Sequence, residues 1–504
     1  MTSPRDIPRG RRRSSGFGVG HPSRGSCSLA SKIRAILVVA LSLAGTPALA
    51  TWAVVLADAE TGEVGIGQAT CVANIDLRAL SAVVVTEHGV ATVQAFVDQS
   101  GLARATIRNE LLAGTAPAQI LDVLDATDPN HETHQYCIVD AQGRAATYTG
   151  TTAQGLAFAG GQTGQVGPIA YCVAGNVLTG APVVAAAVQA ISATSGSLAD
   201  RLMAAMEAAR TMGGDGRCSC SPGNPTGCGS PPPSFVRTAL NGYLVAARTG
   251  DTAACSQCSG GDYYLDLNVA FQGAGGTDPV LLLQPLYDDF RADMEHLPDA
   301  VESVATLDPT ALLPDGSSTA LLEVELLDLN GAPIGVPLSS FTVVHAPSSD
   351  GVTTIGAPLD LGGGSYEVTI AAGTVAGVDR FRVTADDGLR PVILMPEPRL
   401  PVGVPAEVSG VRWSSRVRLE WDAAAGAVSY HVYRGSLAAL SCTFFGVCRD
   451  AFDSDLTDLR FTDLAQPPAG TGFFYLVTSE DSRGNESSLG TSSCGVRSNT
   501  NPCP

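Results

Sequence analysis

The junction between Ala50 and Thr51 is the part of this sequence that could most readily produce a catalytic group. Ala48 and Ala50 form the small-x-small pattern that signal peptidase reads, after an apolar run that begins near residue 33. Cleavage there would leave Thr51 as the first residue of the mature chain. A threonine hydroxyl beside a free α-amine is a nucleophile that carries its own base. The alternative interpretation is that threonine, a common residue, merely follows the cleavage site.

Cysteines form a second group of reactive residues. Of the 13 in the chain, Cys27 precedes the junction, eight lie between it and residue 300, and four follow residue 440. Even numbers in an exported chain indicate disulfides, and we expect Cys442 to pair with Cys448 and Cys494 with Cys503. The alternative is a zinc site formed by the cysteines clustered in mid-chain: Cys218, Cys220, Cys228, Cys255 and Cys258. An oxidising compartment favours disulfides.

His131 and His134 have a spacing that resembles a metal-binding pair. His-x-x-His does not match the i, i+4 pair that a helical zinc-protease motif requires. The pair also follows Asp128-Pro129-Asn130, a turn sequence. We therefore predict a solvated loop here, and neither a metal nor a cofactor is expected in this protein.

Residues 1–50 have the character of an export signal. An arginine-rich start precedes an apolar segment at residues 35–43. This segment is too short to span a bilayer, and no other run reaches the roughly 20 apolar residues required. The sequence predicts a secreted or periplasmic protein without a transmembrane anchor. Lys32, the only lysine, lies in the signal, so cleavage would leave no amine side chain for catalysis.

The chain is strongly acidic. It has 49 acidic and 30 basic residues among 504, a net charge of −19. Eight of the basic residues lie within residues 1–50, so the mature protein would be more acidic still. Binding of nucleic acid is excluded because phosphates demand a basic face. The charge suits a soluble protein whose copies repel one another.

The elements that would position Thr51 follow in a mixed pattern over residues 51–296. Strands are predicted at residues 52–57, 63–70, 80–87, 90–96, 135–140, 145–149, 169–176, 235–247 and 263–271. Helices are predicted at residues 101–113, 116–126, 182–193, 198–212 and 278–294. Antiparallel hairpins interleaved with helix pairs indicate an α+β sandwich of sheets and helices rather than a parallel sheet.

The remainder of the chain changes to β-structure. Residues 300–403 alternate apolar and polar positions at 321–327, 341–344, 365–370 and 379–385, which is typical of a β-sandwich. A proline-rich linker follows. Residues 406–493 predict a second sandwich, with its plainest strands at 417–421, 429–433 and 473–478. Residues 494–504 form a cysteine-containing tail.

Short motifs spread over residues 51–296 resemble one known family. In order they are TWAVV at 51–55, TGEVG at 61–65, GVATVQA at 89–95, CIVD at 137–140, YTG at 148–150, VAGNVL at 173–178, GGD at 213–215, DLNV at 266–269 and DP at 278–279. Together they resemble the bacterial domain-of-unknown-function family 1028, which is grouped with the N-terminal-nucleophile hydrolases. The resemblance implies an αββα sandwich whose first strand places the terminal residue at the sheet's mouth. Members commonly begin with Met-Thr, so Thr51 matches their exposed threonine, although the family's activity and substrate are unsettled.

The chemistry implied is acyl transfer at an amide. Thr51 would attack a carbonyl while its α-amine accepts the proton. Asn176, in a Gly-Asn segment at a strand end, is the candidate oxyanion donor, although such an asparagine is equally typical of a turn. Asp215 and Arg217 could orient the amine or bind a substrate carboxylate, or form only a loop ion pair. Gln94, at another strand end, is a candidate substrate contact.

Two departures from the family pattern bear on this site. Arg217 runs directly into Cys218-Ser219-Cys220, where the family usually continues with glycine. The absence of lysine after residue 50 excludes the lysine-assisted mechanism of proteasome-type threonine proteases. Either Arg217 takes the place of the absent lysine as a fixed cation, or the site is inactive.

The C-terminal regions have their own resemblances. DGSSTA at 315–320 and DLNG at 328–331 place residues 317–387 close to the invasin/intimin-type bacterial immunoglobulin-like domains. LEW at 419–421, YHVYRG at 430–435, FTD at 461–463 and YLV at 475–477 make residues 408–493 similar to fibronectin type III modules. Such modules usually serve as spacers or binding platforms, which implies an extracellular protein or carbohydrate partner.

Two functions are therefore expected from the sequence. The first is a secreted N-terminal-threonine hydrolase that acts on an amide in a small molecule or peptide, with Thr51 as its nucleophile. The alternative is a secreted or surface-associated binding protein that keeps the hydrolase-like fold without catalysis.

Overall fold

The computed structural model describes residues 51–504 except 156, 254–258, 313, 315, 404–406, 425–426, 442–443, 454, 468–469, 481–485, 493–494, 498–502 and 504. The predicted signal at residues 1–50 lies outside the described residues, as do Cys255, Cys258, Cys442 and Cys494. Among the residues that are described, no helix is both long and apolar enough to cross a membrane.

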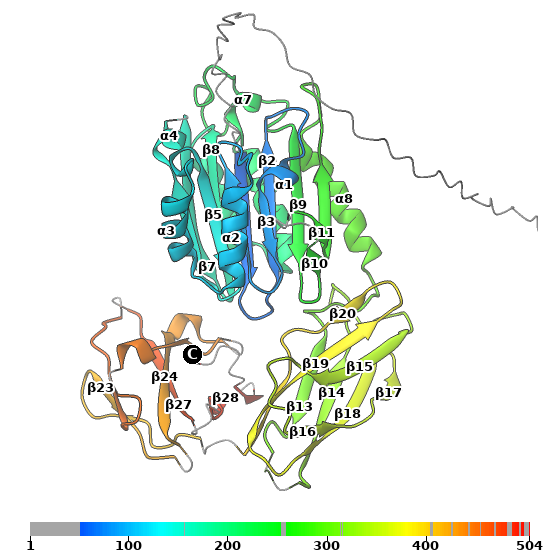
Figure 1. Cartoon of the computed structure of the whole chain (residues 1–504), viewed down its shortest axis with the longest axis vertical. Helices are drawn as coiled ribbons and strands as arrows, with labels where there is room; N and C mark the ends of the chain where they lie inside the picture. Colours follow the sequence, from blue (N-terminus) through cyan, green and yellow to red (C-terminus); the bar gives the residue numbers. More distant parts are fainter. Residues whose placement is uncertain are drawn as a thin grey trace, which may run out of the picture. The chain divides into compact units, whose positions relative to one another are not determined.

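The first strand, β1 (Thr51–Asp58), lies inside a six-stranded antiparallel sheet (Figure 1). In spatial order the strands are β12 (Leu265–Val269), β9 (Asn241–Ala247), β2 (Val64–Thr70), β1, β8 (Ile169–Leu178) and β7 (Phe158–Val166). Trp52 and Leu56 of β1 pack in one apolar core, and Val55 and Ala57 pack in another. Because successive side chains of a strand point to opposite faces, β1 is buried on both sides, which explains its continuous apolar run.

A second antiparallel sheet faces the first. Its strands are β3 (Ala82–Val85), β4 (Gly89–Gln94), β5 (Gln135–Asp140) and β6 (Ala145–Thr149), in that order. Apolar side chains from both sheets form the core between them, and a disulfide from Cys137 on β5 to Cys172 on β8 joins the two sheets covalently.

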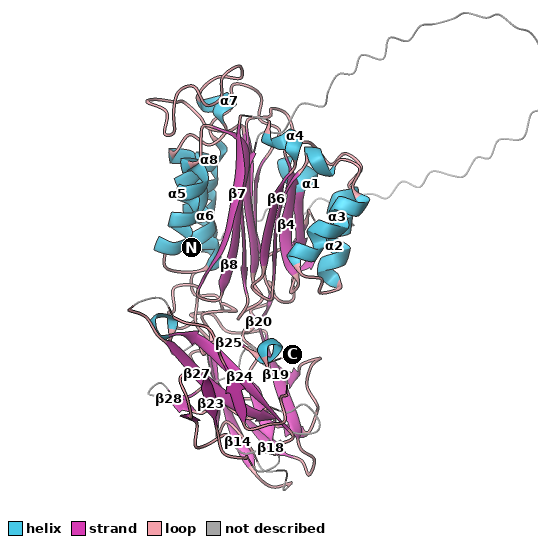
Figure 2. Cartoon of the chain, turned by 90° about the vertical axis from the view of Figure 1, so that its left-hand side faces the viewer, coloured by secondary structure: helices cyan, strands magenta, loops and turns pink. Residues whose placement is uncertain are grey.

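Helices cover the outer face of each sheet, which gives four layers (Figure 2). The first sheet is covered by α5 (Pro182–Ala193), α6 (Leu198–Thr211) and α8 (Pro279–Asp293). The second is covered by α2 (Leu102–Leu112) and α3 (Pro117–Thr127). Local sequence starts these helices: Pro117 and Pro279 occupy first-turn positions, and Asp278 accepts a hydrogen bond from the Val280 amide. The short elements are α1 (Leu77–Ser81), α4 (Thr151–Gln154), α7 (Gly216–Ser219), β10 (Thr252–Ala253), β11 (Gly261–Asp262) and a 3₁₀ turn (His131–Thr133).

The next region contains two antiparallel sheets around one apolar core. The five-stranded sheet contains β13 (Val304–Asp308), β14 (Thr319–Glu325), β18 (Ser365–Ala372), β16 (Thr353–Ile355) and β17 (Leu359–Gly362). The four-stranded sheet contains β15 (Ser340–His345), β19 (Gly377–Asp386), β20 (Pro391–Ile393) and β21 (Arg399–Val402). Along β19 every second residue is buried, which is the alternation expected of a strand with one face in a core.

The last region contains three small sheets. Their strands are β22 (Arg412–Trp413), β23 (Arg418–Glu420), β26 (Arg460–Thr462), β25 (Val447–Cys448), β24 (Ser429–Ser436), β27 (Phe473–Glu480), β28 (Thr491–Ser492) and β29 (Gly495–Val496), with 3₁₀ turns at Leu437–Ala439 and Asp450–Phe452. Trp421, Tyr430 and Phe461 are buried in its core.

The elements expected over residues 51–296 are largely confirmed. The sequence did not predict the short elements α1, α4, α7, β10 and β11, and the longer strands show three differences. The strand β7 was not predicted, because its Gly-Gly-Gln-Thr-Gly sequence lacks an apolar alternation. The strand predicted at 235–247 begins only at Asn241, and the one predicted at 80–87 begins with the end of helix α1. In all three cases pairing with a neighbouring strand, rather than local apolar content, sets the boundary.

Two predictions from the sequence are wrong. Cys448 is bonded to Cys503, so Cys448 does not pair with Cys442 and Cys503 does not pair with Cys494. Neighbours in sequence were favoured because short loops close easily, but here the fold brings residues 55 positions apart together. The histidines predicted to lie in a solvated loop, His131 and His134, are instead buried, and His134 bonds to Asp128 at 2.7 Å, although Asn130 and Glu132 of the same loop are exposed.

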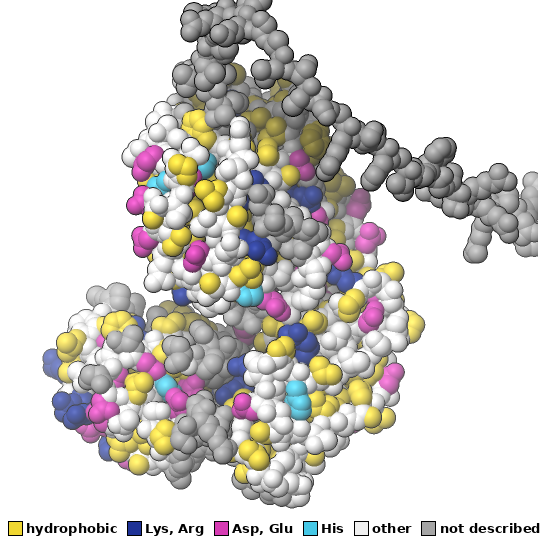
Figure 3. All heavy atoms as spheres, viewed as in Figure 1, with side chains coloured by type: hydrophobic (Ala, Val, Ile, Leu, Met, Phe, Trp, Pro, Cys, Tyr) yellow, Lys and Arg dark blue, Asp and Glu magenta, His cyan; other side chains and the backbone are white. Residues whose placement is uncertain are grey.

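Acidic and basic side chains are interspersed on the described part of the face shown in Figure 3, which carries no continuous basic surface.

Candidate functional site

Thr51 occupies the first position of β1 and is fully buried. It lies opposite Thr70 of β2 on one side and Asn176 of β8 on the other. Because Val55 and Ala57 face the second sheet, the period of two places the Thr51 side chain on that face as well. The nucleophile proposed from sequence therefore lies between the sheets, at the end of an inner strand.

A row of polar residues crosses the sheet at this end. Asn241 of β9 lies opposite Thr70, and Thr70 and Asn176 flank Thr51. All four side chains are completely buried. Apolar residues are the usual occupants of such positions, since a buried polar group must be hydrogen-bonded to avoid a cost of about 1–3 kcal/mol. A polar row confined to one sheet end is therefore a candidate site.

The backbone departs from regular strand geometry immediately after Asn176. The pairing of β7 with β8 is shifted here, so that Phe158 faces Leu178, Ala159 faces Asn176, and Val177 has no opposite residue. Val177 has a φ of +53°, in the left-handed region that a β-branched side chain rarely adopts. Such a bulge costs of order 1–3 kcal/mol and is found preferentially where a strand re-aims a functional side chain.

Gln94 lies inside the protein between the two sheets, with only 1% of its surface exposed. Its side chain accepts from Gln68 Nε2 and donates to Gln135 Oε1, each at 2.7 Å. Gln135 also accepts a hydrogen bond from Asn176. The structure therefore connects Gln94 to Asn176 through Gln135.

Asp215 and Arg217 form the ion pair considered in the sequence, with Arg217 Nη2 2.8 Å from Asp215 Oδ2. Asp215 is fully buried, caps α7, pairs with Leu178 at the end of β8, and accepts from the Cys71 amide at 2.7 Å. Burial raises the pKa of Asp215, and the hydrogen bonds and charge of Arg217 act against that rise. Since Cys71 follows Thr70, Asp215 is anchored to the same sheet end as Thr51.

The glycines before Asp215 allow this approach. Gly214 has a φ of +52°, and a Cβ there would lie 2.6 Å from the Trp52 ring. A side chain at residue 214 would therefore collide with the second residue of β1. The Gly-Gly-Asp motif thus places the Asp215 loop directly against the strand that begins with Thr51.

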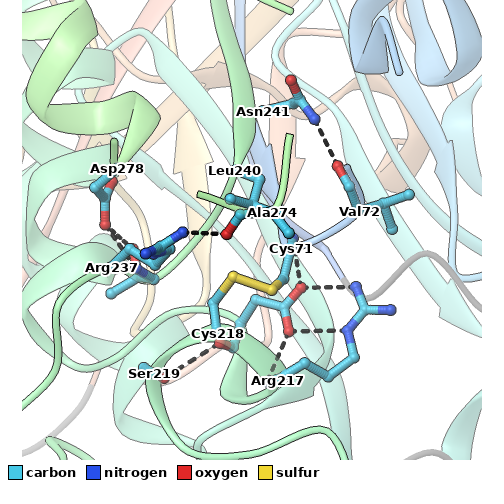
Figure 4. The surroundings of a disulfide bond; sticks show 12 residues. Cys71, Val72, Arg217, Cys218, Ser219, Arg237, Leu240, Asn241, Ala274 and Asp278 are labelled. Atoms are coloured by element: carbon cyan, nitrogen blue, oxygen red, sulfur yellow. Dashed lines mark hydrogen bonds and ion pairs between the residues drawn. A yellow bond between two sulfur atoms is a disulfide. The ribbon is translucent and has the colours of Figure 1, made fainter. Parts of the chain in front are cut away.

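A disulfide fastens the same loop. Cys71, after β2, is bonded to Cys218 in α7, and Figure 4 shows this bond beside Arg217. Cys220 is bonded to Cys228. These four thiols are therefore consumed, which rules out the alternative zinc site at Cys218, Cys220 and Cys228.

Replacing both Cys71 and Cys218 by serine is expected to lower the free energy of unfolding of this region by about 4–5 kcal/mol, because the bond closes a loop of 147 residues. The matched control is the double serine variant at Cys220 and Cys228, whose loop of eight residues predicts a loss of about 2–3 kcal/mol. Guanidinium unfolding of both variants measures the difference. Equal losses of the free energy of unfolding in the two double variants would contradict the conclusion that the Cys71–Cys218 disulfide stabilises this loop more than the Cys220–Cys228 disulfide does.

Two sets of potential metal ligands lie close together among the described residues. Asp125, His131 and Glu132 form one, with both carboxylates exposed. His431, Asp450 and Cys503 form the other, but Cys503 is oxidised and the ring nitrogens of His431 are bonded to Asp450 and Glu480. Burial lowers the pKa of His431, but the hydrogen bonds to Asp450 and Glu480 and the charges of Glu486 and Asp450 outweigh it and raise the pKa to about 9. This favours an ion-pair role for the histidine.

Sequence reasoning missed Gln68, Thr70, Gln135 and Asn241. Gln68 and Thr70 follow the inward apolar residues Val64 and Ile66 of β2. Gln135 and Asn241 likewise stand at the starts of β5 and β9, whose following inward residues are apolar. A polar residue at an inward position of a strand buried on both faces was the signal that could have identified them.

Two known families match parts of this chain. Residues 51–223 match the family of unknown function DUF1028, and residues 299–389 match invasin domain 3. The chain carries a DUF1028 domain followed by an invasin domain 3. Two of the three resemblances expected from the sequence are thereby confirmed, and the DUF1028 match begins at Thr51 itself. The resemblance of residues 408–493 to fibronectin type III modules stays a prediction. No curated protein matches the chain.

Several solved structures are similar to parts of this chain. A DUF1028 protein from Silicibacter pomeroyi is 17% identical and covers 48% of this chain and 88% of its own, with a TM-score of 0.35. The Yersinia pseudotuberculosis adhesin InvE is 17% identical and covers 37% of this chain and 57% of its own, with a TM-score of 0.15. Invasin, a bacterial integrin-binding protein, is 11% identical and covers 86% of this chain and 70% of its own, with a TM-score of 0.17.

Proposed function

We propose that the DUF1028 domain is an N-terminal-nucleophile hydrolase that cleaves an amide bond with Thr51, after a signal peptidase has removed residues 1–50. The observation that carries this proposal is the position of Thr51 at the start of an inner strand, facing the layer between two sheets and opposite Asn176. The αββα order of layers is the architecture that the N-terminal-nucleophile interpretation requires.

The proposed reaction has two acyl-transfer steps. Thr51 Oγ attacks the substrate carbonyl while the Thr51 α-amine accepts the hydroxyl proton. That proton passes to the leaving amine as the amide C–N bond breaks and an ester to Thr51 remains. Water then attacks the ester and gives a proton to the α-amine, which returns it to the leaving Thr51 Oγ as the acid is released. An α-amine titrates near pH 8, so a large fraction is neutral base at physiological pH.

The remaining candidate residues take supporting roles in this proposal. Asn176 Nδ2 has two N–H groups, of which one bonds to Gln135, and the second is a candidate donor to the oxyanion. Arg217, held by Asp215, is a candidate partner for a substrate carboxylate, and its guanidinium supplies the fixed cation that lysine would otherwise provide. Gln94 contributes through Gln135.

A second candidate function is binding of an extracellular protein or carbohydrate, with the DUF1028 fold kept as a non-catalytic body. The observation that favours it is the invasin domain 3 at residues 299–389, since invasin is described as integrin-binding. Residues 406–493 would extend this region as a fibronectin type III-like module. The disulfides fit folding outside the cytoplasm in either case.

N-terminal sequencing of the exported protein tests the first proposal directly. We expect the mature chain to start at Thr51, since only that cleavage creates the α-amine beside the threonine hydroxyl. A mature chain that starts at any other residue would leave Thr51 with an amide nitrogen or remove it, and the binding function would then be favoured.

A further inference from the structure

Four side-chain amides form a continuous chain of hydrogen bonds between the two sheets. They belong to Gln68 on β2, Gln94 on β4, Gln135 on β5 and Asn176 on β8, and none is more than 1% exposed. The successive contacts are 2.7 Å from Gln68 to Gln94, 2.7 Å from Gln94 to Gln135, and 3.3 Å from Asn176 to Gln135. Such a network in an apolar layer is costly unless every member is satisfied.

The orientation of every amide follows from one end of this chain. Gln135 Nε2 lies 3.3 Å from the Gly160 carbonyl and 3.1 Å from the Gly175 carbonyl. Carbonyl oxygens only accept, so the nitrogen of Gln135 must face them and its Oε1 must face Gln94 and Asn176. An amide oxygen also only accepts, so Asn176 must present its nitrogen to Gln135. The oxygen and nitrogen of Asn176 are therefore not interchangeable.

The hydrogen bonds at the Gln68 end of this network agree with the same amide orientations. Ser81 and Tyr243 both donate to Gln68 Oε1. Burial raises the pKa of Tyr243, which keeps its hydroxyl protonated as a donor. Gln68 must then direct its nitrogen toward Gln94, as the contacts require.

This fixed orientation leaves one atom unsatisfied. Asn176 Oδ1 is buried and has no hydrogen-bond partner, which costs about 1–3 kcal/mol and calls for an explanation. Asn176 lies directly opposite Thr51, and facing Cβ atoms of such pairs are about 4.5–5.5 Å apart. The bulge at Val177 adds strain at the next residue. The unsatisfied oxygen of Asn176 and the strained backbone of Val177, both energetically unfavourable, therefore lie beside the proposed nucleophile.

We propose that Gln135 is a positioning residue that turns Asn176 so that its Oδ1 accepts a hydrogen bond from the Thr51 α-amine created by cleavage. In the uncleaved chain the Thr51 nitrogen has a single amide N–H. A free α-amine has two N–H groups, and its ammonium form has three, so cleavage supplies the donor that Asn176 Oδ1 lacks. The bond fixes the direction of the amine toward the threonine hydroxyl. This inference rests on the proposed function and identifies how its base is oriented.

The absence of lysine after residue 50 makes the test specific, since the α-amine of a chain that begins at Thr51 is its only primary amine. Such a chain, residues 51–504, can be released from a ubiquitin-like fusion whose protease leaves Thr51 unmodified. The pKa of the α-amine is then read from the pH dependence of its acetylation rate by acetic anhydride. No substrate is needed, so absence of hydrolytic activity would overturn the proposed function without deciding this inference.

An acceptor beside the amine favours its charged form, so Asn176→Leu and Gln135→Met are each expected to lower the α-amine pKa by about 0.5–1 unit. Gln68→Met is the matched control, because it removes an equally buried amide of the same layer that does not contact Asn176. Its α-amine pKa should remain that of the wild type. Asn176→Asp places a carboxylate opposite the amine and should raise the pKa, which provides a readout even where a leucine or methionine variant does not fold.

Three results would overturn the inference. The first is an α-amine pKa that is unchanged in Asn176→Leu and Asn176→Asp. The second is a shift in the Asn176 variants without a shift in Gln135→Met, which would remove the positioning role. The third is an equal shift in Gln68→Met, which would indicate a general loss of packing.

Discussion

Thr51→Ala is expected to lower the rate of reaction with an electrophilic amide-hydrolase probe by about 10³-fold or more. Removal of a catalytic nucleophile typically reduces the rate of an enzyme by at least this factor. The alanine keeps the α-amine and the small residue after the cleavage site, so export processing should be unaffected. Only the attacking oxygen is removed. Intact-protein mass spectrometry after incubation with the probe measures the labelled fraction, and equal labelling of wild type and variant would exclude Thr51 as the nucleophile.

Two controls separate catalysis from folding in this experiment. Thr51→Ser retains a hydroxyl beside the α-amine and should retain measurable labelling. Thr478→Ala removes an equally buried threonine hydroxyl in the C-terminal sheets, where it donates to Glu486. Its labelling should equal that of the wild type. Loss of labelling in Thr478→Ala would show that probe reaction reports general stability.

The second large effect concerns Asp215. Asp215→Ala is expected to lower the free energy of unfolding of the DUF1028 domain by about 3–5 kcal/mol, because it removes the fully buried carboxylate that accepts hydrogen bonds from Arg217 and from the Cys71 amide. The same change removes the cap of α7, which is worth about 1 kcal/mol and is included in that range. Chemical unfolding monitored by circular dichroism measures the loss.

Asp266→Ala is the matched control for this prediction. Asp266 pairs with Arg78 through both carboxylate oxygens, but the two side chains are 26% and 21% exposed. An exposed ion pair contributes about 0–1 kcal/mol, so this variant should be destabilised far less than Asp215→Ala. The two arginines are equally exposed, so the variants differ in the burial of the carboxylate. Similar losses in the two variants would contradict a special role for the buried Asp215 carboxylate at the sheet end.

Local sequence was sufficient to predict most elements of the DUF1028 domain. The strands with continuous or alternating apolar residues and the helices begun by Pro117 and Asp278 were found close to their observed bounds. These features depend on side-chain period and on capping groups, which lie within a few residues of the element that they define. Thr51 could be proposed for the same reason, since a cleavage signal is a local pattern.

The surroundings of Thr51 could be predicted only in part. Asn176, Asp215, Arg217 and Gln94 were each selected from a short motif, and the structure places the first three at one sheet end and Gln94 in the layer between the sheets. The contact of Asp215 with Cys71 joins residues 144 positions apart. No local pattern encodes which loop will reach that strand end.

The sequence by itself thus predicted the order of the two matched domains and the course of β1. The export junction before Thr51 stays a prediction. Only the tertiary structure decided which polar groups meet there, because the contacts from Gln68 to Gln94 and from Gln135 to Asn176 span 26 and 41 residues. Their partners are chosen by strand register and by the stacking of two sheets. That stacking also forces the amide of Asn176 into one orientation and leaves its oxygen unpaired opposite Thr51.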